Sequence, residues 1–220
     1  TITTPPSSFA DVALVCVQHL LETTGSLIEA FIEIGFRPKN IHILGKLYST
    51  NNSVQTRLRT LGVNVYVGGS QFEWGHYSDQ IVNDIHSMWH RALSSGAFDN
   101  ISRIVVLDDG GANIASVPHL LLGAVPIIGV EQTMSGITLN RTERPPIPFV
   151  GVGSSAAKVL IEPRIIQEAL FRRVSGKISL HSGTVGVVGN GYIGKAVTKG
   201  LQQAGAEVFV YDKDVRHAYE

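Results

Sequence analysis

The strongest chemical signal in the sequence is a glycine-rich turn, Gly189, Gly191 and Gly194, between the apolar runs 185–188 and 208–211. In the strand–helix–strand unit that binds a dinucleotide, the first glycine permits a tight turn and the second lets the backbone approach the pyrophosphate. The third glycine lets the helix pack closely on the strand. The spacing therefore predicts a dinucleotide site within residues 184–212, against the alternative that these glycines are ordinary turn residues of an α/β fold.

The residues around this turn indicate which dinucleotide binds. The helix is expected to begin near Tyr192 and Ile193, where free N–H groups and the helix dipole attract phosphates. Asp212 ends the second apolar run, and a carboxylate there accepts hydrogen bonds from ribose hydroxyls but repels a 2′-phosphate. We therefore expect NAD rather than NADP as the cofactor.

Three further positions carry groups suited to catalysis. Asp109 ends the pair of aspartates after the apolar run 101–107, so its carboxylate either grips sugar hydroxyls or caps local N–H groups. His19 follows the first apolar run and is either an acid–base group or a structural histidine. Lys158 stands early in an expected helix, where the helix dipole disfavours a cation, and Glu162 lies four residues on. That pair is suited to proton transfer but is equally a plain helix salt bridge.

The composition narrows the class of function. Eighteen basic residues balance 18 acidic ones, so the chain has no electrostatic footprint for nucleic acid or an anionic membrane. We expect small molecules or copies of the chain itself as partners. The single cysteine, Cys16, stands in an apolar run and favours a reducing, cytoplasmic setting. No apolar run reaches the ~18 residues of a membrane helix, and His86 and His90 lack a third ligand, so we expect no metal site.

Alternating apolar and helical patterns must position these groups. Strands are expected at 11–17, 41–44, 63–67, 101–107, 125–130 and 149–152, and helices at 19–36, 51–61, 78–93, 116–122 and 155–174. This short spacing predicts a mostly parallel sheet with helices on both faces. Ligands collect outside the carboxyl ends of such strands, where Asp109 and the expected loops 45–52 and 131–136 lie.

A proline-rich stretch at 141–148 marks the best domain boundary. We expect a substrate-side α/β domain over 1–144, an interdomain segment with a crossing helix over 145–180, and the first βαβ unit of an NAD-binding domain over 181–220. Both domains are expected to be Rossmann-like parallel-sheet domains. A full dinucleotide domain has two such halves, so the second domain is expected to be incomplete in this chain.

Several motifs, in their order along the chain, resemble the S-adenosylhomocysteine hydrolase family over about residues 19–212. The matching segments are HLLETTGSLIE at 19–29, STN at 49–51, VVLDDGG at 105–111, EQTMSG at 131–136, the segment 155–162 around Lys158, and the glycine-rich turn with Asp212. The turn alone is shared by many folds, whereas the ordered set is specific to this family.

The resemblance implies a particular use of NAD. In this family, tightly bound NAD+ oxidises the 3′-hydroxyl of the substrate's ribose, the ketone acidifies the 4′ proton, and the homocysteine thiol is eliminated before water adds and the hydride returns. By resemblance, Lys158 assists the 3′ oxidation, and Asp109 and Glu162 hold or relay protons at the ribose hydroxyls. His19 serves the leaving group and the water.

The resemblance also implies binding residues and an assembly. Thr133 and Ser135 touch the cofactor from across the cleft. The residues expected to bind a nucleoside-like substrate are Thr24, Ser49, Thr50, Asn51 and Gln132. A homo-oligomer is implied as well.

The chain departs from the family pattern where the substrate is recognised. Gln132 replaces the second loop glutamate, Leu21 and Thr23 replace the adenine-contacting threonine and glutamate, and Pro163 replaces the asparagine after the catalytic acid, which is Glu162 in place of the usual Asp. Since a site built to hydrogen-bond one partner rejects another, these changes affect the substrate more than the fold. Three functions therefore stay open: an adenosylhomocysteinase-like enzyme or a relative with another substrate, a dehydrogenase of the 2-hydroxyacid type, and a non-catalytic NAD-binding regulatory protein.

Overall fold

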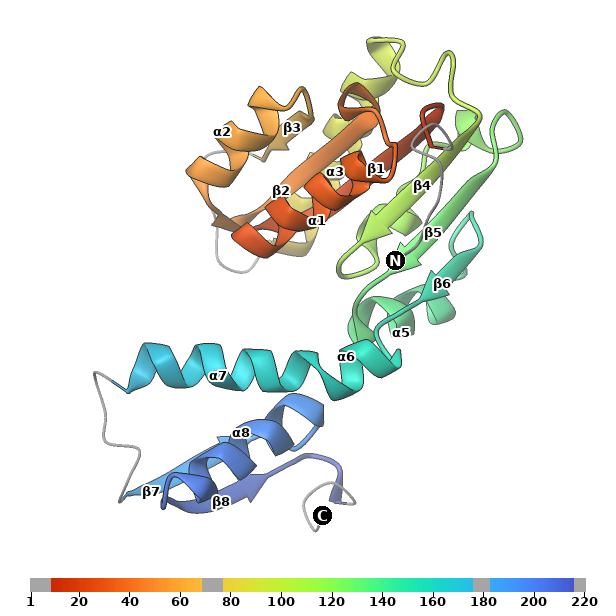
Figure 1. Cartoon of the computed structure of the whole chain (residues 1–220). Coiled ribbons are helices and arrows are strands. Elements are labelled where there is room, and N and C mark those ends of the chain that lie inside the picture. Colours follow the sequence, from red (N-terminus) through yellow and green to blue (C-terminus); the bar gives the residue numbers. More distant parts are fainter. Residues whose placement is uncertain (1–8, 69–76, 176–182, 216–220) are drawn as a thin grey trace. The chain divides into compact units, whose positions relative to one another are not determined.

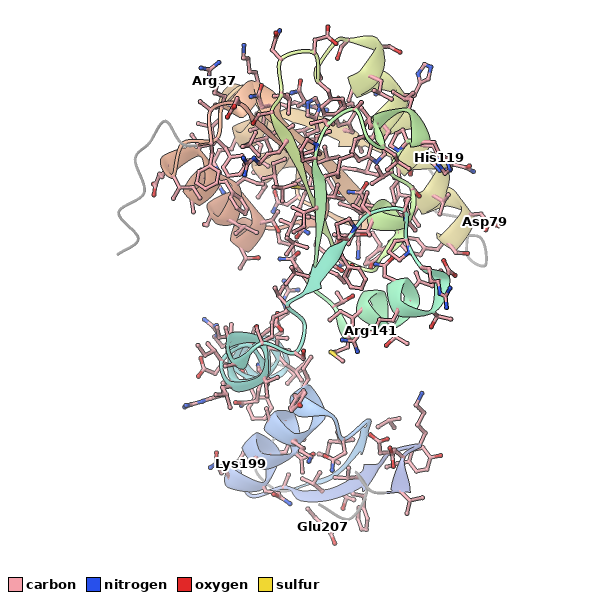
Figure 2. The ribbon with its side chains drawn as sticks, turned by 90° about the vertical axis from the view of Figure 1, so that its right-hand side faces the viewer. Arg37, Asp79, His119, Arg141, Lys199 and Glu207 are labelled. Atoms are coloured by element: carbon pink, nitrogen blue, oxygen red, sulfur yellow. The ribbon has the colours of Figure 1, made fainter. Side chains whose placement is uncertain are left out.

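The computed structural model describes residues 9–68, 77–175 and 183–215 (Figure 1). The chain separates into two compact units, Thr1–Gly153 and Ser154–Glu220. The labelled side chains of Arg37 and Arg141 lie on the outside of the first unit, and those of Lys199 and Glu207 on the outside of the second (Figure 2).

The first unit is a parallel sheet with connecting helices. Its elements are β1 (Val12–Leu20), α1 (Glu22–Glu33), η1 (Pro38–Asn40), β2 (Ile41–Thr50), α2 (Asn52–Thr60), β3 (Asn64–Val67), α3 (Tyr77–Ser94), β4 (Arg103–Asp108), α4 (Ala112–Ala115), η2 (His119–Leu121), β5 (Ile127–Glu131), α5 (Met134–Glu143) and β6 (Phe149–Gly151). The six strands pair in parallel in the order β3-β2-β1-β4-β5-β6. This is the doubly wound Rossmann order, in which the direction of winding reverses between β1 and β4. The predicted α/β class with a parallel sheet is confirmed.

Alternate residues of β1 enter two separate cores, one on each face of the sheet. Val15 packs in a core with Trp89 of α3, whereas Cys16 packs in another with Ile28 of α1 and Leu58 of α2. A strand covered on both faces carries apolar residues at every position, which explains the continuous apolar run in the sequence. On α3, the side chains of Ile81, Ile85, Met88 and Trp89 are buried in the first of these cores.

Two strands extend further toward the carboxyl edge than predicted. His19 lies within β1, not at the start of a helix, and α1 begins only at Glu22. β2 continues to Thr50, where a loop was expected from residue 45. Gly45 and Lys46 interrupt the apolar run of β2, so the strand predicted from that run was too short.

Two helical predictions were wrong. α4 and η2 replace the single helix predicted at 116–122, because Pro118 lies in extended backbone between them and has no N–H for a helix hydrogen bond. α5 occupies Met134–Glu143, where a loop and a domain boundary were expected. Only Gly136, Ile137 and Asn140 of this helix are buried, so it has no apolar stripe for the sequence to reveal.

The second unit holds a βαβ unit and two further helices. Its elements are α6 (Ala156–Leu160), α7 (Glu162–Val174), β7 (Thr184–Val188), α8 (Tyr192–Gln203) and β8 (Glu207–Tyr211), and β7 pairs with β8 in parallel. The helix predicted at 155–174 is broken at Ile161, because Pro163 has no N–H and its ring clashes with a continuous helix before it. α8 approaches α7 closely at Gly200, where a Cβ would lie 2.8 Å from the Phe171 ring.

The segment 145–180, which we expected to lie between domains, divides in the structure. β6 pairs with β5 and completes the six-stranded sheet of the first unit. α7 contributes Phe171 and Val174 to the apolar core of the second unit.

Candidate functional site

β2, β1 and β4 bring together three polar side chains near the point where the winding of the sheet reverses. Lys46 Nζ donates to Asp109 Oδ1 at 2.7 Å, and His19 Nε2 lies 3.8 Å from Asp109 Oδ2. His19 lies near the end of β1 and Asp109 directly follows β4. Ligands of doubly wound sheets bind in the crevice at this reversal, so these residues form the candidate site of the first unit.

An irregularity in β2 turns its side chains toward this site. Gln18 pairs with Gly45, but Leu20 pairs with Thr50, so residues 46–49 of β2 lie opposite the single residue His19 of β1. Such bulges re-aim side chains beside functional sites. The Thr50 hydroxyl donates to the Lys46 carbonyl at 2.9 Å and ties the bulge together.

His19 is held by its neighbours in a largely neutral state. Its Nδ1 is hydrogen-bonded to the Ser49 hydroxyl, and its ring meets the Tyr48 ring edge-on with 5.4 Å between centroids. Burial lowers the pKa of His19, the positive charge of Lys46 lowers it further, and the Asp109 carboxylate opposes both effects. The neutral imidazole is therefore favoured at neutral pH, which suits a proton acceptor.

Two buried carboxylates support the turns behind this site. Asp108 accepts hydrogen bonds from the backbone N–H groups of Asp109 and Ile114, each at 2.9 Å, and Glu131 Oε1 accepts from the N–H and hydroxyl of Thr133, each at 2.7 Å. Burial, with the Glu131 charge as a smaller cause, raises the pKa of Asp108 to about 7. These carboxylates hold the β4 and β5 turns in place.

Gln132, which replaces a glutamate of the family pattern, is hydrogen-bonded within this site. Gln18 Nε2 donates to Gln132 Oε1 at 2.6 Å, linking the ends of β1 and β5. The predicted cofactor contacts beside it are internally bonded, since Ser135 Oγ donates to Thr133 Oγ1 and Thr133 Oγ1 caps α5 by accepting from the Gly136 N–H. A glutamine here supplies an amide in place of a second carboxylate.

Three other predicted substrate residues, Thr24, Thr50 and Asn51, form hydrogen bonds with backbone groups near the candidate site. The Thr24 hydroxyl donates to the His19 carbonyl at 2.6 Å, and the Thr50 hydroxyl closes the bulge of β2. Asn51 caps α2 by accepting from the Ser53 and Val54 N–H groups. All three lie at the predicted edge of the sheet, and their hydrogen bonds in the structure are to backbone groups.

The glycine-rich turn of the second unit has the shape that a dinucleotide requires. Gly189 adopts a φ of 96°, a conformation that disfavours other residues. A Cβ on Gly194 would lie 1.8 Å from the Gly189 carbonyl oxygen, whereas a Cβ on Gly191 would meet nothing within 4 Å. Gly191 is the N-cap of α8, and the first N–H groups of this helix, at Tyr192 and Ile193, have no acceptor within the helix itself. These residues fit a pyrophosphate.

Asp212 closes the same turn. Its Oδ2 accepts from the Asn190 N–H at 2.6 Å and its Oδ1 from the Asp214 N–H at 2.8 Å. The Asp212 carboxylate therefore fixes the loop that follows the glycine-rich turn.

Lys158 and Glu162 form a salt bridge in the second unit. Lys158 Nζ lies 2.6 Å from Glu162 Oε1, and the two side chains are 31% and 40% exposed. The structure thus pairs His19 with Asp109 in the first unit and Lys158 with Glu162 in the second. The geometry fits both alternatives raised by the sequence, a solvent-exposed helix pair and a proton-transfer pair.

Three residues of the candidate site were not predicted from the sequence: Lys46, Gln18 and Tyr48. The available signal was Lys46, a lone charged residue within an otherwise apolar or small stretch that leads to the carboxyl edge of the sheet. Asp108 was noted only as a second carboxylate, and its burial depends on the pairing of β4 with β5.

Neither a metal cluster nor a membrane helix occurs in the described parts of the chain. No group of three His, Cys, Asp or Glu side chains within residues 9–68, 77–175 and 183–215 could hold a metal ion. Over the same ranges, no helix is both long enough and apolar enough to cross a membrane.

Comparison with known proteins does not assign an activity to this chain. No family model matches the chain. Uncharacterized proteins from two strains of Mycobacterium tuberculosis are each 31% identical over 211 residues, which cover 91% of this chain and 40% of the relative. The chain therefore spans less than half the length of these relatives. One of the subunits of dipicolinate synthase from Bacillus halodurans superposes with a TM-score of 0.47 at 13% identity, covering 90% of this chain and 60% of that one, a similarity too low to indicate function.

Proposed function

We propose that this chain belongs to an NAD-dependent, adenosylhomocysteinase-like enzyme that reversibly oxidises a ribose-type 3′-hydroxyl and cleaves a thioether, or to a relative with another hydroxylated substrate. The observation that carries the proposal is the cluster of Asp109, Lys46 and His19 at the reversal of a Rossmann-order sheet. The same chain carries a glycine-rich turn suited to a dinucleotide.

The second unit supplies the cofactor site in this proposal. The open space at Gly191 and the helix N–H groups of Tyr192 and Ile193 receive the pyrophosphate of NAD, and Asp212 binds the adenosine ribose. Bound NAD+ would supply the hydride acceptor. By the family resemblance, Thr133 and Ser135 also contact the cofactor.

The first unit supplies the substrate site. Asp109 Oδ2 and His19 Nε2 lie 3.8 Å apart, so one hydroxyl group of a ligand can contact both atoms. Neutral His19 is then suited to accept or return a proton, and Asp109 orients the hydroxyl. Lys158 and Glu162 assist the oxidation by resemblance only, and their short contact is compatible with proton exchange.

The substrate is the part of the proposal that the family resemblance supports least. Gln132 is bonded to Gln18, and Leu21 and Thr23 stand where the family reads adenine. We therefore propose a nucleoside-like substrate whose base is recognised differently. By the same resemblance we propose that the protein forms a homo-oligomer. Measuring the molar mass of the purified protein by light scattering tests this proposal.

The experiment is a single-turnover measurement on the intact protein. Small molecules that co-purify are identified by mass spectrometry, and the NAD-loaded protein is then mixed with S-adenosylhomocysteine and with a panel of nucleosides. We expect absorbance of bound NADH without release of free NADH, and loss of this signal in Asp109→Asn. Neither cleavage nor reduction of the cofactor with any nucleoside would overturn the proposal, and steady release of NADH with a hydroxy acid would indicate a 2-hydroxyacid-type dehydrogenase.

A non-catalytic NAD-binding regulator is the second candidate. The observation that favours it is the exposed Lys158–Glu162 pair, which has the geometry of an ordinary salt bridge. Tight NAD binding without turnover, unchanged in Lys158→Ala, would support the regulator and contradict the enzyme.

A further inference from the structure

Lys46 is a buried cation inside the candidate substrate site. Its side chain is 9% exposed, and it projects from the extra segment that β2 inserts opposite the end of β1. Lysine is almost never this buried unless its charge is paired. The partner of Lys46 is the Asp109 carboxylate, 2.7 Å away.

The two oxygens of Asp109 have different neighbours. Oδ1 accepts from Lys46, whereas Oδ2 faces His19 Nε2 at 3.8 Å, which is too long for a hydrogen bond. The backbone N–H of Asp109 is also fixed, because it donates to Asp108. One oxygen of the carboxylate is therefore held and the other is turned toward the imidazole.

We propose that Lys46 is a positioning residue, which anchors one oxygen of Asp109 and makes the His19 imidazole, rather than the Asp109 carboxylate, the proton acceptor of this site. In the tautomer that donates Nδ1–H to the Ser49 hydroxyl, Nε2 carries the lone pair and lies 3.8 Å from Asp109 Oδ2. Two acceptor atoms then lie 3.8 Å apart, an arrangement that suits a ligand hydroxyl as the donor. The acceptor role rests on the proposed function, whereas the control of His19 by Lys46 does not.

The charges around His19 agree with this arrangement. One oxygen of Asp109 already has a charged partner, because Lys46 Nζ donates to it. The groups that face His19 are Lys46 and Tyr48 from β2, Asp109 after β4, and, beyond Tyr48, Tyr77 of α3. Burial and a hydrogen bond to Tyr48 raise the pKa of Tyr77, so the tyrosine stays neutral and Lys46 and Asp109 decide the protonation of His19.

The arrangement also disfavours an anionic group of the substrate beside His19. The positive charge of Lys46 is already paired with Asp109. A ligand carboxylate beside His19 would therefore meet the other, negatively charged oxygen of Asp109. An uncharged hydroxyl meets no such repulsion. The site formed by Lys46, His19 and Asp109 is therefore suited to a diol or other neutral hydroxylated ligand.

The test is an NMR titration of His19 in the purified full chain, with its resonance assigned by loss of the signal in His19→Gln. In Lys46→Met, which keeps the length of the side chain, the His19 titration should shift to higher pH, because the cation is lost and Asp109 is freed. Asp109→Asn should shift it to lower pH, and the double variant should lie between the two. Lys39→Met is the control, since it removes an exposed lysine of the same unit and should leave the titration unchanged.

The result that overturns the proposal is a His19 titration that stays in place or moves to lower pH in Lys46→Met. If Lys46→Met does not fold, Lys46→Gln replaces it, and an unchanged titration in Asp109→Asn overturns the proposal independently of both. These measurements need neither NAD nor substrate, so failure of the enzyme hypothesis leaves their outcome readable. With turnover established, Lys46→Met should lower kcat about 10- to 100-fold, with a smaller change in KM and a displaced pH profile.

Discussion

Replacing Gly191 and Gly194 separately by alanine distinguishes a cofactor turn from an ordinary turn. A dinucleotide site needs the second glycine so that phosphate can approach the backbone, whereas the third glycine serves the fold itself. In the structure a Cβ on Gly191 would meet nothing within 4 Å, and a Cβ on Gly194 would lie 1.8 Å from the Gly189 carbonyl oxygen. The two substitutions add the same methyl group three residues apart.

The expected magnitudes differ in kind. Gly191 has a φ of −71°, which alanine adopts without strain. Alanine gains about 0.4–1 kcal/mol from a less flexible unfolded chain and loses a similar amount as a poorer N-cap, so stability should change by less than about 1 kcal/mol. The methyl group would occupy the space of a phosphate, and a steric cost of about 1–3 kcal/mol corresponds to roughly 5- to 150-fold weaker NAD binding.

The assay combines calorimetric titration with NAD and urea unfolding of the same samples. Gly191→Ala should weaken NAD binding with its unfolding curve almost unchanged. Gly194→Ala should destabilise the second unit by about 1–3 kcal/mol or more, because the overlap is with backbone. If Gly191→Ala binds NAD as tightly as the unchanged chain, the phosphate does not approach this glycine and the assignment of the turn is refuted.

Three further substitutions test the core, the buried carboxylates and the exposed pair. Trp89→Phe should destabilise the first unit by about 2–4 kcal/mol in urea unfolding, since it leaves a cavity and removes the buried 2.9 Å hydrogen bond to Asn113, and a change below about 0.5 kcal/mol would contradict this. The pKa of Asp108 is raised from 3.8 to about 7 in the folded chain, so between these pH values the folded state binds a proton that the unfolded state has lost. This group therefore lowers the free energy of unfolding as the pH rises from about 4 to 7. Asp108→Asn should therefore flatten the difference between unfolding free energies measured at pH 5 and pH 8, and an unchanged difference would argue against the shift. Lys158→Ala should cost less than about 1 kcal/mol of stability, because its bridge to Glu162 is exposed, yet should reduce cofactor reduction by at least about 100-fold if Lys158 takes part in proton transfer.

The sequence by itself determined the class of fold and the position of the glycine-rich turn. Continuous apolar runs such as that of β1 occur because both faces of a parallel strand are buried, and the three glycines at 189, 191 and 194 have conformations and contacts that the chain specifies locally. The sequence did not reveal α5, whose buried positions include a glycine and an asparagine rather than an apolar stripe. It also placed His19 on a helix, because the apolar pattern of β1 continues without a break into that of α1.

Only the tertiary structure decided how the candidate substrate site is assembled. Lys46, His19 and Asp109 are far apart in sequence, and they meet because β2, β1 and β4 are neighbours whose carboxyl ends share one edge. The extra residues of β2 turn Lys46 toward Asp109, and such a register shift depends on the pairing of two strands rather than on either one alone. The electrostatic state of His19 follows from that packing, since burial and the neighbouring charges arise only when the sheet has formed.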